Sequence, residues 1–357
     1  MKILIDINHP AHVHYFKNFI KFMKIRKHKF LIISRNKEIE HYLLEKYNIE
    51  YVDRGRGGEG QLGKIFYFFI AIMFIFKKVI IFKPDVLISF GTPYPAIVGW
   101  LVKKPHISFN DTEHATIHHL LTDPFSEIII TPSCYNKDMG EKHIYFNGYM
   151  EMCYLHPNYY KPDSSILELL NLKRDEKYII IRFVSWNAVH DRGHQGLDLR
   201  EKEELVKNIS NQAKVFISSE SELPDSLKKY QISIPAERMH DALAFATLLI
   251  SEGATMASEC AILGTPAIYI NSLEVGYCTE EEQKYNLVFN FRNSLGVLNK
   301  AIELVNTKDL SSKFRNHHKR LLIDKIDVTA FMVWFIENYP DTVKIMNENP
   351  EYQNRFR

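Results

Sequence analysis

The feature that most constrains this fold is the regular alternation of short apolar runs with helix-like segments. The runs, such as KILIDI, DVLISF and YIIIRF, are nearly continuous stretches of Val, Ile, Leu and Phe. They lack the strict polar–apolar alternation of strands that face water on one side. Strands buried on both faces of a parallel sheet have this composition. The β–α–β–α order therefore predicts an α/β protein with doubly wound parallel sheets.

Two such series follow each other along the chain, which suits a length of 357 residues. The stretch 149–163 has prolines and tyrosines but no period, and it predicts a linker. We expect a Rossmann-like domain over residues 1–155, a second over residues 164–325, and a C-terminal helical segment, 326–345, that packs toward the first. Residues 346–357 are predicted to be poorly ordered. The carboxyl ends of both sheets are expected to face a central cleft.

The composition limits the binding partners and the cellular compartment that we expect for this chain. The net charge is only +2, without a concentrated basic stripe, which argues against a nucleic acid partner. No signal peptide is visible at the start of the sequence. The cysteines show no paired spacing and predict free thiols in a reducing compartment, so we expect a cytoplasmic protein. These cysteines are Cys134, Cys153, Cys260 and Cys278.

One stretch, IFYFFIAIMFIF at residues 65–76, is apolar enough to raise the question of a membrane. As a helix it would reach about 18 Å, against about 30 Å for the hydrocarbon core of a bilayer. We therefore predict a helix that does not span. It either packs in the core or docks on the inner face of a membrane as a peripheral contact. Lys64, Lys77 and Lys78 at its ends would suit anionic lipid head groups.

The segment SEGATMASECAILG, residues 251–264, combines small residues with an acid at a strand-to-helix turn. Gly253 and Ala254 would let the backbone approach a ligand closely. The free N–H groups at the helix start favour a phosphate, and Glu259 could accept hydrogen bonds from ribose hydroxyls. The alternative is a capped helix, in which Thr255 with Ser258 or Glu259 forms a capping arrangement.

This segment resembles the nucleotide-binding segment of GT-B glycosyltransferases. It is similar above all to the pattern Gly-Ala-x-Thr-x-x-Glu followed by Gly-x-Pro, found in the N-acetylglucosaminyltransferase that makes lipid II. The hydroxyl is displaced by one residue here. The resemblance implies that Thr255 and Met256 lie at a diphosphate and Glu259 at a ribose. The matching positions are Gly253, Ala254, Met256, Glu259, Gly264 and Pro266.

Other stretches extend the resemblance along the second half of the chain. IIIRFVSWNA takes the place of the first strand and turn of the nucleotide domain, although the Gly-Gly-Ser pattern of that family is missing. RMHDAL resembles the loop beside the uracil, and EEQKYN resembles the segment that reads the donor sugar. The residues so implied are Arg182 and Ser185 at phosphate, Met239 and His240 at the nucleotide, and Gln283 and Asn286 at the sugar.

The first half carries two further motifs. HPAHVHYF, after the first strand, resembles the Gly-His-Val loop of the same family at His12 and Val13, without the glycines. The chain also resembles, over nearly its full length, a large family of uncharacterised archaeal and bacterial GT-B-like proteins. Those proteins share an Asp-x-x-x-Pro-x-His-Val loop, present here from Asp6, and the NDTEH motif at 110–114. The resemblance implies a GT-B fold.

Asp111 and Glu113 of NDTEH follow a predicted strand end, where a carboxylate could act as general base on an acceptor hydroxyl. His12 is a second candidate, at a phosphate or on the acceptor side. The alternatives are a loop network that caps the next helix and a packed histidine. His9, His12 and His14 also raise a metal site, but residues two apart on a helix point to different faces.

The chain has no Asp-x-Asp motif. We therefore expect a metal-independent glycosyltransferase with no cofactor, in which a helix dipole and Arg182 stabilise the leaving diphosphate. It would move sugar from a UDP-linked donor to a glycan or lipid-linked acceptor in polysaccharide synthesis.

Two rival functions stay open. The first is a non-hydrolysing UDP-N-acetylglucosamine 2-epimerase. That family has a His-Val-Glu-Ala-Gly motif, and Glu113 and Ala115 resemble its Glu and Ala. That family also has an acid in a Gly-Asp-Thr motif at the place where this chain has Phe90, Gly91 and Thr92. The missing acid argues against the epimerase. The second is a non-catalytic nucleotide-sugar-binding protein.

Overall fold

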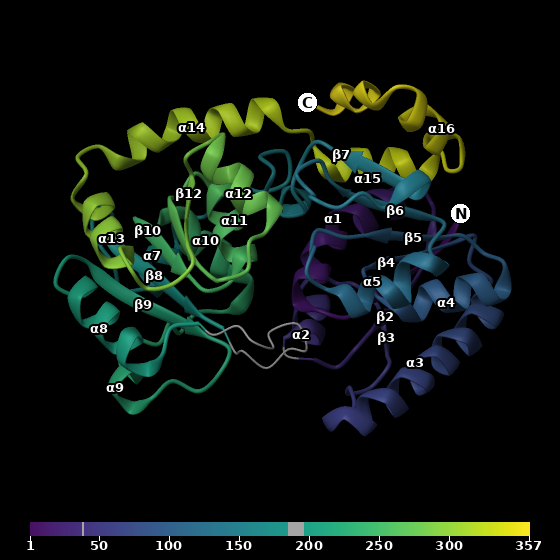
Figure 1. The fold of residues 1–357 in the computed structure, drawn as a ribbon, viewed down its shortest axis with the longest axis horizontal. Coiled ribbons are helices and arrows are strands. Elements are labelled where there is room, and N and C mark those ends of the chain that lie inside the picture. Colours follow the sequence, from purple (N-terminus) through teal and green to yellow (C-terminus); the bar gives the residue numbers. More distant parts are fainter. Residues whose placement is uncertain (38, 185–195) are drawn as a thin grey trace. The chain divides into compact units, whose positions relative to one another are not determined.

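The computed structural model describes the chain except residues 38 and 185–195, and it divides into two compact units (Figure 1). Unit 1 comprises Met1–Tyr154 and Lys325–Arg357, and unit 2 comprises Leu155–Asp324. Each unit contains one parallel sheet flanked by helices. The α/β class predicted from the apolar runs is therefore confirmed.

The sheet of unit 1 has, within the described residues, the strand order β3-β2-β1-β4-β5-β6-β7. The order reverses between β1 and β4, so the carboxyl ends of these two strands flank a topological switch point, where open α/β sheets bind ligands. The strands are β1 (Lys2–Ile7), β2 (Lys29–Ser34), β3 (Val52–Asp53), β4 (Val86–Phe90), β5 (His106–Phe109), β6 (Ile128–Pro132) and β7 (His143–Phe146).

Helices cover both faces of this sheet, as right-handed crossovers on either side of the switch point require. On one face, α1 (Pro10–Ile25) contacts α2 (Glu40–Lys46) and α15 (Val328–Glu337), which returns from the end of the chain. On the other face, three helices pack side by side (Figure 1). These are α3 (Gly60–Phe82), α4 (Pro93–Val102) and α5 (Thr116–Thr122).

Helix α3 is longer than the sequence predicted. The predicted segment ended at Phe76 because Lys77 and Lys78 interrupt the apolar run, yet the helix continues to Phe82. It is long and apolar enough to cross a membrane by length and composition. Nevertheless, Ile75 and Val79 pack in the sheet core with Leu4, Leu87 and other apolar residues. A helix tolerates lysines that reach water, so their presence does not end it.

The C-terminal segment is ordered, so the prediction of poor order for residues 346–357 is wrong. Helix α16 (Asp341–Glu348) is followed by the 3₁₀ helix η5 (Pro350–Phe356). Buried Gln353 accepts a hydrogen bond from the backbone N–H of Asn147 at 2.7 Å. The local sequence is polar, and its order comes from contacts with strands that lie far away along the chain.

The sheet of unit 2 has, among the described residues, the strand order β12-β11-β10-β8-β9, with its switch point between β8 and β10. Its strands are β8 (Tyr178–Phe183), β9 (Lys214–Ser219), β10 (Leu248–Ser251), β11 (Ala267–Ile270) and β12 (Val288–Phe291). Its helices are α7 (Ile166–Leu169), α8 (Leu199–Ile209), α9 (Asp225–Lys228), α10 (Met239–Phe245), α11 (Ala254–Leu263), α12 (Gly276–Gln283), α13 (Val297–Asn306) and α14 (Leu310–Asp324).

The remaining short elements join the larger ones. Helix α6 covers Met152–Leu155, where the chain passes from unit 1 to unit 2. The other 3₁₀ turns described are η1 (Asp123–Phe125), η2 (Gly140–Lys142) and η4 (Ala236–Arg238).

Candidate functional site

The turn between β10 and α11 lies at the switch point of unit 2. Gly253 occupies the N-cap position of α11, and within the described residues no side-chain hydrogen bond caps the helix. The Ser251 hydroxyl instead holds the turn itself, accepting from the Gly253 N–H at 2.9 Å and donating to the Gly253 carbonyl at 2.7 Å. The capping arrangement through Thr255 is therefore wrong. Among the residues that the structure describes, the first N–H groups of α11, at the positive end of the helix dipole, meet no side-chain acceptor.

The turn also has little spare room on the β8 side. A Cβ atom on Gly253 would stand 3.3 Å from Cγ1 of Val184, the residue that follows β8. Thr255 and Met256 in the first turn of α11 are half-buried, whereas the residues from Ala257 to Ile262 are buried. The small residues therefore allow two strand ends to approach each other, and they leave the start of α11 accessible.

Two residues predicted from separate motifs meet on the buried side of α11. Nε2 of His240, in α10, lies 3.0 Å from Oε1 of Glu259. Both side chains are buried, and the Tyr160 ring lies 6.2 Å from the His240 ring. The imidazole therefore fixes the orientation of the carboxylate. Met239 directly precedes His240 and is half-buried at the start of α10.

An acid that the sequence interpretation missed organises the same switch point. Buried Glu252 accepts a hydrogen bond from Val184 N–H at 3.0 Å and another from Leu197 N–H at 2.7 Å, while Lys202 Nζ lies 3.5 Å from it. Glu252 thus binds the chain on both sides of residues 185–195. Ser185, a predicted phosphate contact, lies outside the described residues. The sequence did offer one signal for Glu252, namely an acid placed directly between a buried strand and a glycine.

The backbone of Arg182 pairs with β10 beside the α11 turn, but its side chain points away from it. Its guanidinium donates to the hydroxyl of Ser218 at 2.8 Å and to the carboxylate of Glu220 at 2.6 Å, both at the carboxyl end of β9. The ion pair with Glu220 holds the side chain on the opposite side of β8 from β10. In this arrangement the arginine charge is already matched by a carboxylate.

The two residues predicted at the donor sugar lie at different edges of the sheet of unit 2. Gln283, in the last turn of α12, lines a cavity of about 230 Å³ together with Asn271, Thr279, Asn290 and Arg292. This cavity lies at the carboxyl ends of β11 and β12. Asn286 is exposed, has a positive φ of 50°, and comes just before β12, at the amino edge of the sheet. The structure therefore does not place Asn286 beside the other predicted residues.

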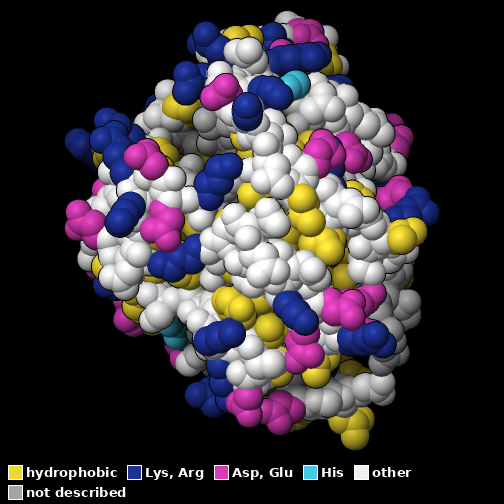
Figure 2. Space-filling view, turned by 90° about the vertical axis from the view of Figure 1, so that its left-hand side faces the viewer, with side chains coloured by type: hydrophobic (Ala, Val, Ile, Leu, Met, Phe, Trp, Pro, Cys, Tyr) yellow, Lys and Arg dark blue, Asp and Glu magenta, His cyan; other side chains and the backbone are white. Residues whose placement is uncertain are grey.

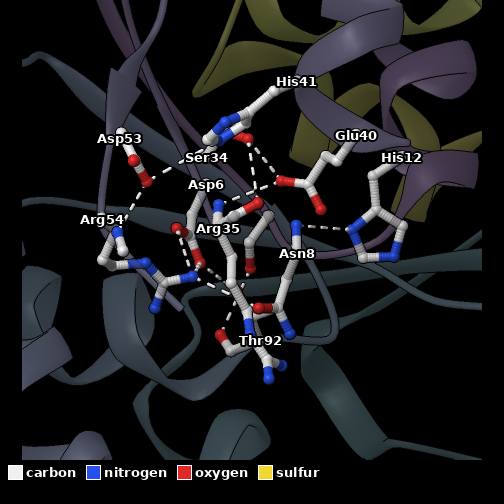
Figure 3. Close-up of polar contacts among 12 residues, drawn as sticks. Asp6, Asn8, His12, Ser34, Arg35, Glu40, His41, Asp53, Arg54 and Thr92 are labelled. Carbon is white, nitrogen blue, oxygen red and sulfur yellow. Dashed lines mark hydrogen bonds and ion pairs between the residues drawn. The ribbon is translucent and has the colours of Figure 1, made fainter. Parts of the chain in front are cut away.

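In unit 1, a buried polar cluster stands at the carboxyl edge of β1, β2 and β3 (Figure 3). Nη2 of Arg54 lies 3.2 Å from Oδ1 of Asp6 and donates to Oδ1 of Asn8 at 3.3 Å. The hydroxyl of Thr92 donates to Oδ2 of Asp6 at 2.9 Å. Burial raises the pKa of Asp6, and the Arg54 charge and the Thr92 hydrogen bond oppose the rise. Arg54 was not predicted, since only its position after a strand end could have signalled it.

A second buried acid belongs to the same edge. Glu40, in the first turn of α2, accepts hydrogen bonds from the hydroxyl of Ser34 and, at 3.0 Å, from the N–H of Arg35 (Figure 3). Burial is the largest influence and raises the pKa of Glu40 to about 7, against the effect of the Ser34 hydrogen bond. Glu40 therefore keeps its proton to about pH 7, and burial shifts the pKa of Asp6 in the same direction.

His12 projects from the first turn of α1 toward the end of β4. Its Nδ1 accepts from the N–H of Asn8 at 3.4 Å, and its ring lies 4.9 Å from that of Phe90. Burial, with the nearby His9 as the next cause, lowers the pKa of His12 well below its usual value. The imidazole is therefore neutral at pH 7, and because Nδ1 accepts from Asn8, its Nε2 carries the hydrogen and can donate it.

The three neighbouring histidines point to different surroundings. His9 is the N-cap of α1, and its Nδ1 accepts from the N–H of Ala11 at 3.2 Å. His14 stacks on Tyr154 with the ring centres 5.1 Å apart. Only His12 lies against Phe90 at the switch-point edge.

Asp111 and Glu113 follow β5, on the same carboxyl edge as His12. Burial raises the pKa of Asp111 to about 7, the Thr112 hydrogen bond at 2.9 Å opposes the rise, and the Glu113 charge adds to it. His119 of α5 lies 3.0 Å from the Thr112 carbonyl, which ties the loop to α5. In the described part of the chain the N-cap residue of α5, Ala115, makes no side-chain cap hydrogen bond, so the helix-capping alternative is not formed there. The loop carries a carboxyl group able to exchange a proton at neutral pH.

Comparison with solved structures shows the fold. The UDP-N-acetylglucosamine 2-epimerase of Neisseria meningitidis, solved with UDP-N-acetylglucosamine bound, matches with a TM-score of 0.64 and 13% identity, over 90% of this chain and 98% of that one. The glycotransferase of kitacinnamycin matches with a TM-score of 0.58 and 13% identity, over 94% and 98%. Both matches cover the two units, so the chain has the GT-B fold predicted from the sequence.

Comparison of sequences gives the family. An uncharacterised protein of Methanocaldococcus jannaschii, MJ0665, is 26% identical over 279 residues, which is 75% of this chain and 81% of that protein. The model of the family described as a protein of unknown function, DUF354, matches residues 1–339. That span includes both switch points and the NDTEH loop. The chain therefore belongs to the DUF354 family.

Proposed function

We propose that this chain is a metal-independent glycosyltransferase that moves a sugar from a UDP-linked donor to a hydroxyl group of a glycan or lipid-linked acceptor. The observation that carries the proposal is the start of α11. There an accessible helix N-terminus follows Gly253, which no side chain of the described residues caps, and the buried Glu259–His240 pair lies one and a half turns further on. Phosphate groups bind favourably at such helix starts.

Unit 2 supplies the donor site in this proposal. The diphosphate accepts hydrogen bonds from the first N–H groups of α11, whose dipole stabilises the charge that develops on the leaving UDP. The carboxylate of Glu259, oriented by His240, accepts from the ribose hydroxyls. Glu252 keeps the β8 and β10 loops together, and the cavity at Gln283 offers space for part of the donor.

Unit 1 supplies the acid–base groups. Asp111 retains its proton until about pH 7, which is the range in which a general base works efficiently. In the transfer step, the acceptor oxygen forms a bond to the anomeric carbon while the bond from that carbon to the phosphate oxygen breaks. UDP leaves with the bonding electrons, and the carboxylate takes the acceptor proton. His12 was also predicted as a base, but its lowered pKa makes it a weaker base than Asp111.

The relatives support the donor class. The Neisseria epimerase was solved with UDP-N-acetylglucosamine, and the Staphylococcus aureus MnaA structure, with a TM-score of 0.65 and 12% identity over 89% of this chain, contains UDP. A cytoplasmic role in polysaccharide biosynthesis fits such a donor. No cofactor is required by the proposed step.

A second candidate is epimerisation at C2 of the same donor. It is favoured by the adjacent Asp111 and Glu113, because the charge of one raises the pKa of the other and the pair can offer both a proton donor and an acceptor. The switch point of unit 1 does contain an acid beside Thr92, although it is Asp6 from β1 and it is already paired with Arg54.

Proton NMR with UDP-N-acetylglucosamine distinguishes the candidates. A transferase is expected to leave the nucleotide sugar intact without acceptor and to release UDP when glycan or lipid-linked acceptors are added. Formation of the 2-epimer by the protein alone would contradict the transferase proposal and support the epimerase. Absence of UDP binding in calorimetry would contradict both candidates.

A further inference from the structure

Helix α3 belongs to the folded sheet and yet exposes an apolar side. Its buried residues, Tyr67, Ala71, Ile75 and Val79, recur every four positions and form one stripe against the sheet. A surface helix normally carries polar residues on the opposite side. Here the exposed side is apolar, and its side chains that are more than half exposed include Ile65, Phe66, Phe69, Met73, Ile80 and Ile81.

The stripe also decides how α3 can meet a membrane. A spanning helix would have to withdraw Ile75 and Val79 from a core that they share with Leu4, Ile33 and Leu87. Burial of such side chains stabilises the unit by about 1.5–3 kcal/mol each. The helix therefore stays on the sheet, and its outer side is available to a flat apolar surface.

The neighbouring helices continue this apolar side. Helix α4 packs on α3, and α5 packs on α4. Trp100 and Leu101 at the end of α4, and Ile117 and Leu120 on α5, are each more than half exposed. We call the outer side of α3, α4 and α5 the apolar face. Contiguous exposed apolar surface of this kind marks an interaction site.

The charges carried by α3 and α4 themselves have one sign, while the exposed acids Glu59 and Asp85 flank α3 on either side. Residues 60–84 and 93–104 contain no Asp or Glu, and their charged residues are Lys64, Lys77, Lys78, Lys83, Lys103 and Lys104. The face of the molecule that looks out past α8 and α13 differs, because Lys or Arg and Asp or Glu side chains alternate over it (Figure 2). Lysines that surround apolar side chains match anionic head groups above a hydrocarbon layer.

We propose that the apolar face binds the surface of an anionic lipid bilayer, with α3 lying in the plane of the interface. A second copy of the chain fits the face less well. A two-fold symmetric contact brings the same patch of both copies together, so lysines would meet lysines. This inference is independent of the proposed enzymatic function, since it uses no residue of either switch point.

The test is co-sedimentation of the full chain with vesicles, either of phosphatidylcholine alone or with phosphatidylglycerol added. We expect binding to the anionic vesicles that weakens in high salt, and at least tenfold weaker binding to phosphatidylcholine. The triple variant Phe66→Gln, Phe69→Gln and Met73→Gln, and the charge variant Lys77→Glu with Lys103→Glu, should each reduce partition into anionic vesicles at least tenfold.

Matched controls place the same changes on unit 2. Leu199→Gln with Leu295→Gln replaces exposed leucines, and Lys207→Glu with Lys229→Glu reverses exposed lysines. Both controls should bind vesicles as the unchanged protein does. Circular dichroism melting should show that every variant is folded, because the replaced side chains are exposed.

Four results would overturn the proposal. One is absence of binding to anionic vesicles, and another is equal binding to both lipid compositions. The third is retention in the vesicles after washing with alkaline carbonate, which would indicate a spanning helix. The fourth is a dimer in sedimentation velocity without lipid that the triple variant dissociates, which would assign the face to a second copy.

Discussion

At the scale of single residues, burial sets the protonation states on the carboxyl edge of unit 1. His12 is kept neutral, while Asp111 and Glu40 keep their protons to about pH 7. Each of these groups is removed from water and partly compensated by hydrogen bonds. One edge of a sheet therefore presents a neutral base and carboxylic acids together at neutral pH, which is a composition suited to proton transfer.

The pKa of Asp111 predicts how stability changes with pH. The folded chain holds this proton up to about pH 7, whereas the unfolded chain releases it near the ordinary value of 3.8. The free energy of unfolding should therefore fall as pH rises from about 4 to about 7. Asp111→Asn removes this contribution and should raise stability at pH 8 by about 1–3 kcal/mol relative to the unchanged chain. Urea unfolding at pH 5 and pH 8 measures the difference.

The control for that experiment is Asp309→Asn, which removes an exposed carboxylate. It should leave the difference between the two pH values unchanged. If Asp111→Asn shows the same pH dependence as the unchanged chain, Asp111 is ionised in the folded state. In that case its pKa is near the ordinary value, and it is a weaker general base than a carboxylate whose pKa matches the working pH.

The Glu259–His240 pair predicts a selective effect on nucleotide binding. Glu259→Gln keeps the shape of the side chain but weakens the charged acceptor that the ribose hydroxyls would meet. Hydrogen bonds to charged groups contribute about 1.5–3 kcal/mol, so the Kd for UDP should rise about tenfold or more. The Kd for inorganic diphosphate, which has no ribose, should stay unchanged. Isothermal titration calorimetry with both ligands measures the two constants.

Glu280→Gln is the matched variant, because Glu280 lies in α12 and pairs with Lys284 instead. It should bind both ligands normally. Equal weakening of UDP and diphosphate by Glu259→Gln would show that the residue supports the turn and does not contact the ribose.

At the scale of elements, the strands could be predicted because their apolar runs are a local signal. The apolar runs KILIDI and YIIIRF coincide with β1 (Lys2–Ile7) and β8 (Tyr178–Phe183). Gly264 was also readable as a helix end, and it does terminate α11 with φ of 82°. The end of α3 was predicted too early, since lysines were taken as breaks in a helix that continues through them.

The candidate site could be predicted only in part, because local patterns reveal motifs but not distant partners. Glu259 and His240 lie in recognisable motifs, and a contact between them joins α10 to α11. Glu252 and Arg54 act through partners that no local pattern reveals, namely backbone N–H groups 55 and 68 residues away and a carboxylate 48 residues away. Such long-range pairings depend on the order of the strands in the sheet, which no local sequence pattern reveals.

Helix α11 gives a prediction of its own. Gly264 has a positive φ, and a Cβ there would stand 3.0 Å from the ring of His318. Gly140 also has a positive φ, but a Cβ there would meet nothing within 4 Å. Gly140→Ala should therefore cost about 1 kcal/mol from backbone strain alone. Gly264→Ala should cost at least 1 kcal/mol more, as measured by urea unfolding, and equal costs would contradict the crowding by His318.

At the scale of the whole molecule, unit 1 is built from both ends of the chain. The final residues were predicted to be disordered because MNENPEYQNRFR is polar, but Phe356 lies 5.5 Å from the ring of Trp334, and its carbonyl accepts from the N–H of Asp327 at 2.7 Å. Their order depends on a strand and a helix that local composition cannot reveal. The C-terminal residues thus pack onto unit 1, and Gln353 is buried there.

Gln353 tests this arrangement. Gln353→Ala leaves the N–H of Asn147 without its side-chain acceptor, at an expected cost of about 1–3 kcal/mol. The melting temperature of unit 1 should fall by about 2–10 °C, while the Kd of unit 2 for UDP should not change. Gln61→Ala, at the exposed start of α3, should leave both unchanged. A normal melting temperature for Gln353→Ala would show that the tail adds nothing to unit 1.

The return of α15 to α1 has a consequence for synthesis on the ribosome. Unit 2 is inserted between the two parts of unit 1, so all of it must be translated before α15 exists. At typical elongation rates this takes roughly 10–30 s. During that interval the surface of α1 that α15 will cover is exposed in the nascent chain and open to chaperones. Unit 2 can complete its fold first, and the last residues to leave the ribosome close the domain that began to emerge first.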